Sequence, residues 1–155
     1  MEFHVRSARL TDVDNSMRML MREGDGVSEQ RGDADRFRSL LFLPSATVVV
    51  AEVERRIVGV GVLSIRPTVR TGPFVGVIDE LGLEGTAGRG TRAARADASG
   101  RMAIGSSILE HLISSARNKG CARVEVTDPL AAAEPTLLKS AGFERRGTLL
   151  SRAIG

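Results

Sequence analysis

The residue types that first suggest chemistry form a glycine-containing segment at the start of an amphipathic helix pattern. It runs from Gly100 to Cys121, GRMAIGSSILEHLISSARNKGC, with small residues at Gly100, Ala103 and Gly105. The apolar positions that follow have the spacing of one helix face: Ile104, Ile108, Leu109, Leu112 and Ile113. Backbone N–H groups at the start of a helix can receive a phosphate. The segment therefore predicts a helix over about 102–118 and an anion site at its beginning.

Two adjacent carboxylates, Asp79 and Glu80, lie on a strongly β-prone run, Phe74 to Leu83. Strand alternation predicts that these two side chains point to opposite faces. Gly76 and Gly82 in the same run are poor strand formers and indicate a bulge or a close backbone approach.

Length and composition predict one domain spanning 1–155, with an ordinary share of hydrophobic residues. The one cysteine, Cys121, excludes an internal disulfide, and the few histidines are too scattered for us to expect a metal site. The chain has no membrane-length apolar run and no signal-peptide pattern at its start, so we expect a cytoplasmic protein without a membrane partner.

The basic residues are nearly all arginine: of 22, only Lys119 and Lys139 are lysines, and the net charge is +3. Arginine suits phosphates and carboxylates, but this usage can equally reflect the base composition of the source genome. The chain has no Trp and no Tyr, which argues against single-stranded nucleic acid binding by aromatic stacking. We therefore do not expect a nucleic-acid partner.

The order of the predicted elements indicates an α/β sandwich. We expect strands at 3–9, 46–53, 57–65, 74–83 and 121–127, one or two closing strands within 143–154, and helices from 13, around 36–42, at 102–118 and at 131–141. The stretch 84–99 is expected to be a long loop. Strands 74–83 and 121–127, joined through a helix, should lie parallel and side by side, with helices covering both faces of a mixed sheet.

This order and three signatures resemble the GNAT superfamily of acyl-CoA-dependent N-acyltransferases over essentially the whole chain. The signatures are the hairpin VVVAEVERRIVGVGVLSIRP, the strand-loop-helix VIDELGLE…GRMAIGSSILEHLISSAR, and the segment LLKSAGFERRGTLL. The resemblance implies a three-layer α/β/α sandwich with a mixed, mostly antiparallel sheet of six to seven strands. It also implies direct transfer of an acetyl group from acetyl-CoA to an amine of a small molecule or peptide.

In the family, a Gln/Arg-x-x-Gly-x-Gly/Ala pattern holds the pyrophosphate of coenzyme A. With Gly105 at its last position, Gly100 and Ala103 stand where Gln/Arg and Gly are expected. The resemblance then implies that backbone amides bind the pyrophosphate and that Arg101 can add charge; the amides are those of Met102, Ala103, Ile104, Gly105 and Ser106. A second register exists at Glu84 to Gly90, less favoured because non-periodic residues separate it from the predicted helix.

The strand at 74–83 carries the family's remaining cofactor and catalytic positions. The resemblance implies that the backbone of Leu81, Gly82 and Leu83 pairs with the pantetheine arm like an added strand, with Gly82 allowing close approach. It also implies that Glu80 takes the proton of the amine, the alternative being a structural acid paired with an arginine. For Cys121 and Asp128 we favour packing and turn roles.

The chain departs from the family at the general acid. Many members have a tyrosine where this chain has Leu138, and an asparagine where it has Ala131. A leucine cannot donate a proton, so another residue or water must protonate the thiolate. Two alternatives to an active enzyme remain. One is a catalytically silent GNAT-fold protein that binds acyl-CoA or another ligand for regulation. The other is a basic module that binds nucleic acid through Arg89, Arg92 and Arg95.

The acceptor pocket would, by the same resemblance, be formed largely by the helices around residues 13–42. These helices carry no readable specificity code. A homodimer is a further expectation, since dimers are common for this fold.

Overall fold

The computed structural model describes residues 2–21, 27–84 and 92–155. Its centre is a five-stranded sheet in the order β1-β2-β3-β4-β5. The strands are β1 (His4–Ser7), β2 (Ala46–Val53), β3 (Arg56–Pro67), β4 (Phe74–Leu83) and β5 (Cys121–Val126). The first four are antiparallel neighbours, and β5 runs parallel to β4 as the crossover predicted.

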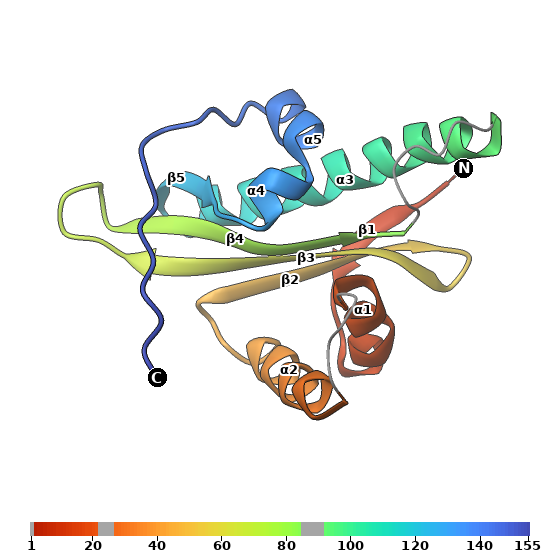
Figure 1. Ribbon diagram of the computed structural model, residues 1–155, viewed down its shortest axis with the longest axis horizontal. Helices are drawn as coiled ribbons and strands as arrows, with labels where there is room; N and C mark the ends of the chain where they lie inside the picture. The colour runs from red at the N-terminus through yellow and green to blue at the C-terminus, as the bar shows by residue number, and fades with distance from the viewer. Residues whose placement is uncertain (1, 22–26, 85–91) are drawn as a thin grey trace.

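Helices cover both faces of the sheet, so the predicted α/β sandwich is confirmed (Figure 1). The short 3-10 turn η1 (Leu10–Asp12), α1 (Val13–Leu20) and α2 (Val27–Leu40) belong to one face. The other face carries α3 (Arg92–Asn118), α4 (Leu130–Ala133) and α5 (Pro135–Ser140). Two hydrophobic cores result, one on each side of the sheet.

The expectation of six to seven strands is wrong, because the described residues after α5 form no strand. Instead, the C-terminal segment runs as an irregular chain past the end of the sheet (Figure 1). Leu149, Leu150 and Ile154 in this segment are exposed. Local β preference there is not supported by burial of apolar side chains, which decides strand formation in practice.

The helix α3 begins at Arg92, well before the predicted start near Met102. Residues 92–99 are rich in alanine and arginine, which are strong helix formers, but they have no apolar periodicity. The periodicity rule therefore missed the first part of the helix. The same reason explains α2, which includes the polar stretch that the sequence placed before a shorter helix.

The predicted helix at 131–141 is divided into α4 and α5. Pro135 starts α5 at its first turn, where the missing N–H costs nothing. Glu134 between the two helices has non-helical dihedral angles.

Glycines on β3 allow α3 to lie close to the sheet. A Cβ atom on Gly59 would be 2.8 Å from Cδ1 of Ile108, and one on Gly61 would be 2.5 Å from its Cγ2. Both distances are too short for a real contact, so the helix is seated at a depth that only glycine permits. This packing holds β3 and β4 in place against α3.

Within residues 2–21, 27–84 and 92–155, no helix is both long and apolar enough to cross a membrane. In the same ranges, no three His, Cys, Asp or Glu side chains lie together as a group that could hold a metal ion.

Candidate active site

A β-bulge at Asp79 determines which way Glu80 faces. In the register of β3 and β4, Val62 lies opposite Glu80 and Leu63 lies opposite Ile78, so Asp79 is the extra residue. Ile78 packs in the core under α3. Regular alternation would put Glu80 on that same face, but the extra residue moves it to the face covered by α1 and α2, where it lines a pocket.

The bulge also overturns the prediction that Asp79 and Glu80 point to opposite faces. The Ser64 hydroxyl donates a hydrogen bond of 2.8 Å to Oδ2 of Asp79. Ser64 is two residues beyond Val62, which belongs to the core under α1 and α2, so it shares that face. Asp79 therefore lies on the same side as Glu80, but it is exposed and does not line the pocket.

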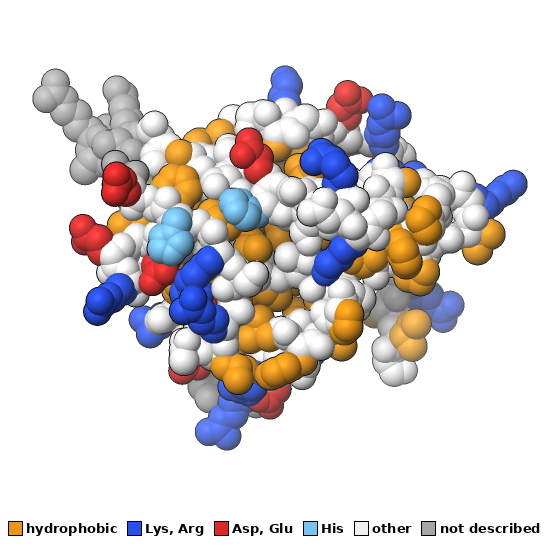
Figure 2. Space-filling view, turned by 180° about the vertical axis from the view of Figure 1, so that it is seen from behind, with side chains coloured by type: hydrophobic (Ala, Val, Ile, Leu, Met, Phe, Trp, Pro, Cys, Tyr) orange, Lys and Arg blue, Asp and Glu red, His pale blue; other side chains and the backbone are white. Residues whose placement is uncertain are grey.

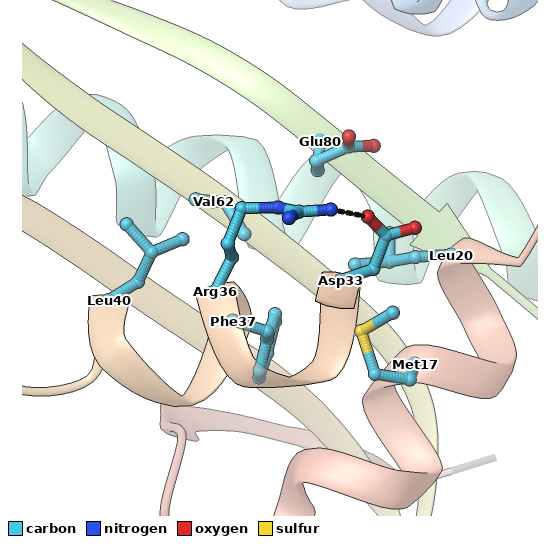
Figure 3. Close-up of a pocket in the computed structure, with 8 residues that line it drawn as sticks. All are labelled: Met17, Leu20, Asp33, Arg36, Phe37, Leu40, Val62 and Glu80. Atoms are coloured by element: carbon cyan, nitrogen blue, oxygen red, sulfur yellow. Dashed lines mark hydrogen bonds and ion pairs between the residues drawn. The ribbon is translucent and has the colours of Figure 1, made fainter. Parts of the chain in front are cut away.

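The pocket lies between the sheet and the two N-terminal helices and has a volume of about 320 Å³. Ligand pockets range over about 300–1,000 Å³, so this one suits a small molecule better than a long chain segment. It is lined by Met17, Leu20, Asp33, Arg36, Phe37, Leu40, Val62 and Glu80 (Figure 3).

Two charged residues of the pocket, Asp33 and Arg36, were not predicted from the sequence. They form an ion pair one turn apart on α2, and the close-up draws the Asp33 carboxylate beside the Arg36 guanidinium and the Glu80 carboxylate above this pair (Figure 3). The sequence signal for the pair was an Asp and an Arg at i and i+3 on a helix, a spacing that brings side chains together. The predicted helix started too late to include Asp33.

The two strands that flank the site separate at this point. The last paired residues of β4 and β5 are Ile78 and Val126, yet β4 continues to Leu83. Leu81, Gly82 and Leu83 pair with β3 on one side. Within the described ranges no strand pairs with their other edge, so this edge has the shape needed for a ligand that binds like an added strand.

Gly82 is the site of a close backbone approach, one of the two alternatives that the glycines of this strand indicated. A Cβ atom here would be 2.6 Å from the carbonyl oxygen of Met19, so only glycine lets α1 rest on β4 at this depth. The bulge that glycines 76 and 82 suggested lies at Asp79 instead.

We expect Gly82→Ala to lower the free energy of unfolding by about 1–3 kcal/mol, because the new methyl group meets backbone rather than a movable side chain. Urea unfolding followed by circular dichroism measures this change. Gly155→Ala is the control for a generic glycine effect, because a Cβ atom there meets nothing within 4 Å. If Gly82→Ala kept the stability of the parent protein but lost binding of acetyl-CoA, the packing role would be contradicted.

The residues predicted to hold pyrophosphate lie in the interior of α3, from Arg101 to Ser106. Only the first four N–H groups of a helix lack a partner within the helix, so the amides of Met102 to Ser106 are not available as donors. Gly105 instead accommodates Leu137, whose Cδ2 atom would be 2.6 Å from an added Cβ. The condition on which this prediction depended, a helix that starts near Met102, is not met.

Arg101 is engaged in an ion pair rather than directed to a loop. Its side chain and that of Glu134, 16% and 14% exposed, form two hydrogen bonds, one of them from Nη1 to Oε2 at 3.1 Å. The pair joins α3 to the junction of α4 and α5. Arg101 is therefore a structural residue in this arrangement.

The position of the family's tyrosine offers no proton donor. Leu138 is 5% exposed and packs in the core beneath α3. Cys121 also packs against this core, and burial raises the pKa of its thiol above its ordinary value. Asp128 lies in a turn before Pro129, as expected.

The arginines of the described residues are widely used in ion pairs. Pairs with Asp or Glu are formed by Arg6, Arg36, Arg38, Arg56, Arg66, Arg101, Arg123 and Arg146. On the face shown in Figure 2, basic side chains are interspersed with acidic ones rather than gathered in one stripe. Arg89, Arg92 and Arg95 of the predicted basic loop lie where no side chain is described.

Comparison with protein families identifies the class. The model of the acetyltransferase (GNAT) family matches residues 14–143. The chain therefore belongs to the GNAT acetyltransferase family, as the sequence signatures indicated. No curated protein matches it.

Solved structures share the fold over nearly the full length. A transcriptional regulator from Bacillus halodurans C-125 is 20% identical with a TM-score of 0.72, covering 99% of this chain and 100% of its own. Glucosamine-6-phosphate N-acetyltransferase from Arabidopsis thaliana is 15% identical with a TM-score of 0.66, covering 100% of both chains. Aminoglycoside N-acetyltransferase AAC(6')-Iy, solved in complex with CoA, is 15% identical with a TM-score of 0.68, covering 99% of this chain and 95% of its own.

Proposed function

We propose that this protein transfers an acetyl group from acetyl-CoA to an amine of a small molecule, acting as a single domain over residues 1–155. The observation that carries the proposal is the position of Glu80, which lines a pocket beside the point where β4 and β5 part. At this position a carboxylate lies between the pocket, which would hold the acceptor, and the edge of β4, which would hold the thioester. Family membership supports the reaction class.

In the proposed reaction, Glu80 takes a proton from the bound ammonium group, directly or through one water. The amine nitrogen then attacks the thioester carbonyl carbon, a C–N bond forms, and the C–S bond breaks to release the thiolate of coenzyme A. A backbone N–H of Leu81, Gly82 or Leu83 polarises the carbonyl oxygen. The nitrogen loses its second proton as the C–N bond forms, and, because Leu138 cannot donate a proton, water carries that proton to the departing thiolate.

The pyrophosphate of coenzyme A is proposed to bind at the first turn of α3, near Arg92, where N–H groups without helical partners meet the positive end of the helix dipole. The second register identified in the sequence, Glu84 to Gly90, comes directly before this turn. The objection to that register was the distance to a helix starting near Met102, and the observed start of α3 removes it. Residues 85–91 themselves lie outside the described residues.

This placement predicts that acetyl-CoA raises the melting temperature, by about 5–10 °C at a hundredfold excess over its dissociation constant. Gly90→Asp puts a negative charge beside the proposed phosphate site and should abolish most of the shift. Gly100→Asp, in the interior of α3, should leave it intact. If acetyl-CoA raised the melting temperature of Gly90→Asp but not that of Gly100→Asp, the phosphate site would lie at Met102–Ser106 instead.

A second candidate function is favoured by the buried Leu138 at the place of the family's proton donor. It is a catalytically silent protein that binds an acyl-CoA or another ligand in a regulatory role. One structure of the same fold is described as a transcriptional regulator. This candidate predicts the same melting shift with acetyl-CoA but no release of thiol with any amine.

A further inference from the structure

The candidate pocket carries charges of both signs over an apolar floor. Glu80 comes from β4, while Asp33 and Arg36 come from α2 (Figure 3). The floor includes Phe37 and Val62, both buried. An occupant that is complementary to this wall brings a basic group toward Glu80, an acidic group toward Arg36 and an apolar body onto the floor.

Arg36 is held at the pocket by an ion pair that a ligand carboxylate can replace. Its partner in the ion pair, Asp33, is on the same helix, and the two side chains are 71% and 43% exposed. Exposed pairs of this kind contribute little to stability. The described bond uses Nη2, whereas an arginine fork can hold a carboxylate through two parallel N–H bonds.

Gly32 favours this position of the guanidinium. A Cβ atom on Gly32 would be 3.2 Å from Nη1 and 3.5 Å from Nη2 of Arg36, so the missing side chain leaves the space that the guanidinium occupies. The positive guanidinium of Arg36 repels a second ammonium group on the acceptor. It attracts a carboxylate to the wall of the pocket that also carries Glu80.

We propose that the acceptor is a small α-amino acid with an apolar side chain: Arg36 binds its carboxylate, and its amino group faces Glu80. This inference rests on the proposed acetyl transfer and adds the chemical class of the acceptor. The contrasting occupant is a dication, which would displace Arg36 and bind Asp33 and Glu80 through two ammonium groups.

The test compares leucine, methionine and phenylalanine, each with its amide and its decarboxylated amine, and includes 1,4-diaminobutane as a dication. Thiol release from acetyl-CoA gives kcat/KM for each acceptor. We expect the free amino acids to be preferred about 10–100-fold, the value of a charge-assisted bidentate bond. Arg36→Gln should remove this preference mainly through KM, and Arg38→Gln, the same change at an arginine of α2 that does not line the pocket, should keep it.

Isothermal titration of the same amino acids into CoA-bound protein separates failure of this inference from failure of the reaction. Amino acid binding that Arg36→Gln abolishes supports the acceptor class even without thiol release. Equal or better turnover of the amides, the decarboxylated amines or the diamine overturns it. So does absence of amino acid binding in both assays. The melting shift with acetyl-CoA should be unchanged in Arg36→Gln, which shows that the variant is folded.

Discussion

Replacing Glu80 with glutamine should lower kcat for acetyl transfer by about 10²–10⁴-fold, the usual contribution of a positioned general base. The amide keeps the size of the side chain but cannot accept the proton of the amine. Because Glu80 lines the pocket that we propose for the acceptor, the rise in melting temperature caused by acetyl-CoA should remain. Steady-state thiol release at saturating acetyl-CoA measures the change.

Asp79→Asn is the matched control for this variant. It removes the neighbouring carboxylate, which lies on the same face but outside the pocket, and the amide can still accept the hydrogen bond from Ser64. Its kcat should stay within a few-fold of the parent protein. If Asp79→Asn were inactive and Glu80→Gln active, the base would be Asp79 and the assignment made from the bulge would fail.

The second large effect is expected at Asp12, which joins the first strand to the first helix. Its carboxylate accepts hydrogen bonds from Nη1 and Nη2 of Arg6 at 2.7 and 3.0 Å, and from the backbone N–H of Arg9 at 2.7 Å. Nε of Arg6 also donates to Glu52 at 3.0 Å. Asp12 is 5% exposed, so its removal leaves a largely buried guanidinium with one partner fewer.

We expect Asp12→Ala to lower the free energy of unfolding by about 3–5 kcal/mol, the cost of breaking a buried pair. Asp12→Asn should cost less, because its amide oxygen still accepts the Arg9 bond. Urea denaturation measures both. A loss below about 1 kcal/mol in Asp12→Ala would show that the pair does not hold β1 and η1 together.

The same residue predicts how stability depends on pH. The hydrogen bonds from Arg6 are the main reason that the pKa of Asp12 lies below its ordinary value of 3.8. The unfolded chain therefore binds this proton more tightly than the folded one. The stabilisation is complete above about pH 5 and is lost as the pH falls through the lowered pKa. The difference between the parent protein and Asp12→Ala should shrink on acidification.

The antiparallel part of the sheet could be predicted from the sequence because its strands are continuous β-prone runs. The bounds of β2 and β4 match their runs, and the parallel pairing of β5 follows from the handed crossover. The sequence predicts strands on both sides of the turn at Glu54 and Arg55 but not the geometry of the turn. Its two residues have positive φ, 47° and 66°, a geometry typical of tight hairpins that no residue type there announces.

The site could be predicted only in part, since its geometry depends on one extra residue in β4. Glu80 was identified, but alternation along the strand cannot show a bulge at Asp79, which forms through pairing with β3. The start of α3 was missed for a different reason. Apolar periodicity marks where a helix becomes amphipathic, whereas α3 starts earlier in an alanine- and arginine-rich stretch.

The most direct test of acetyl transfer is to incubate the purified protein with acetyl-CoA and the amino acid panel, and to quantify free thiol and acetylated product by mass spectrometry. The account predicts equal amounts of both, dependent on the protein and lost in Glu80→Gln. Binding of acetyl-CoA without thiol or acetylated product from any amine, in this panel and in a broad panel beyond it, would contradict it and leave a silent ligand-binding protein.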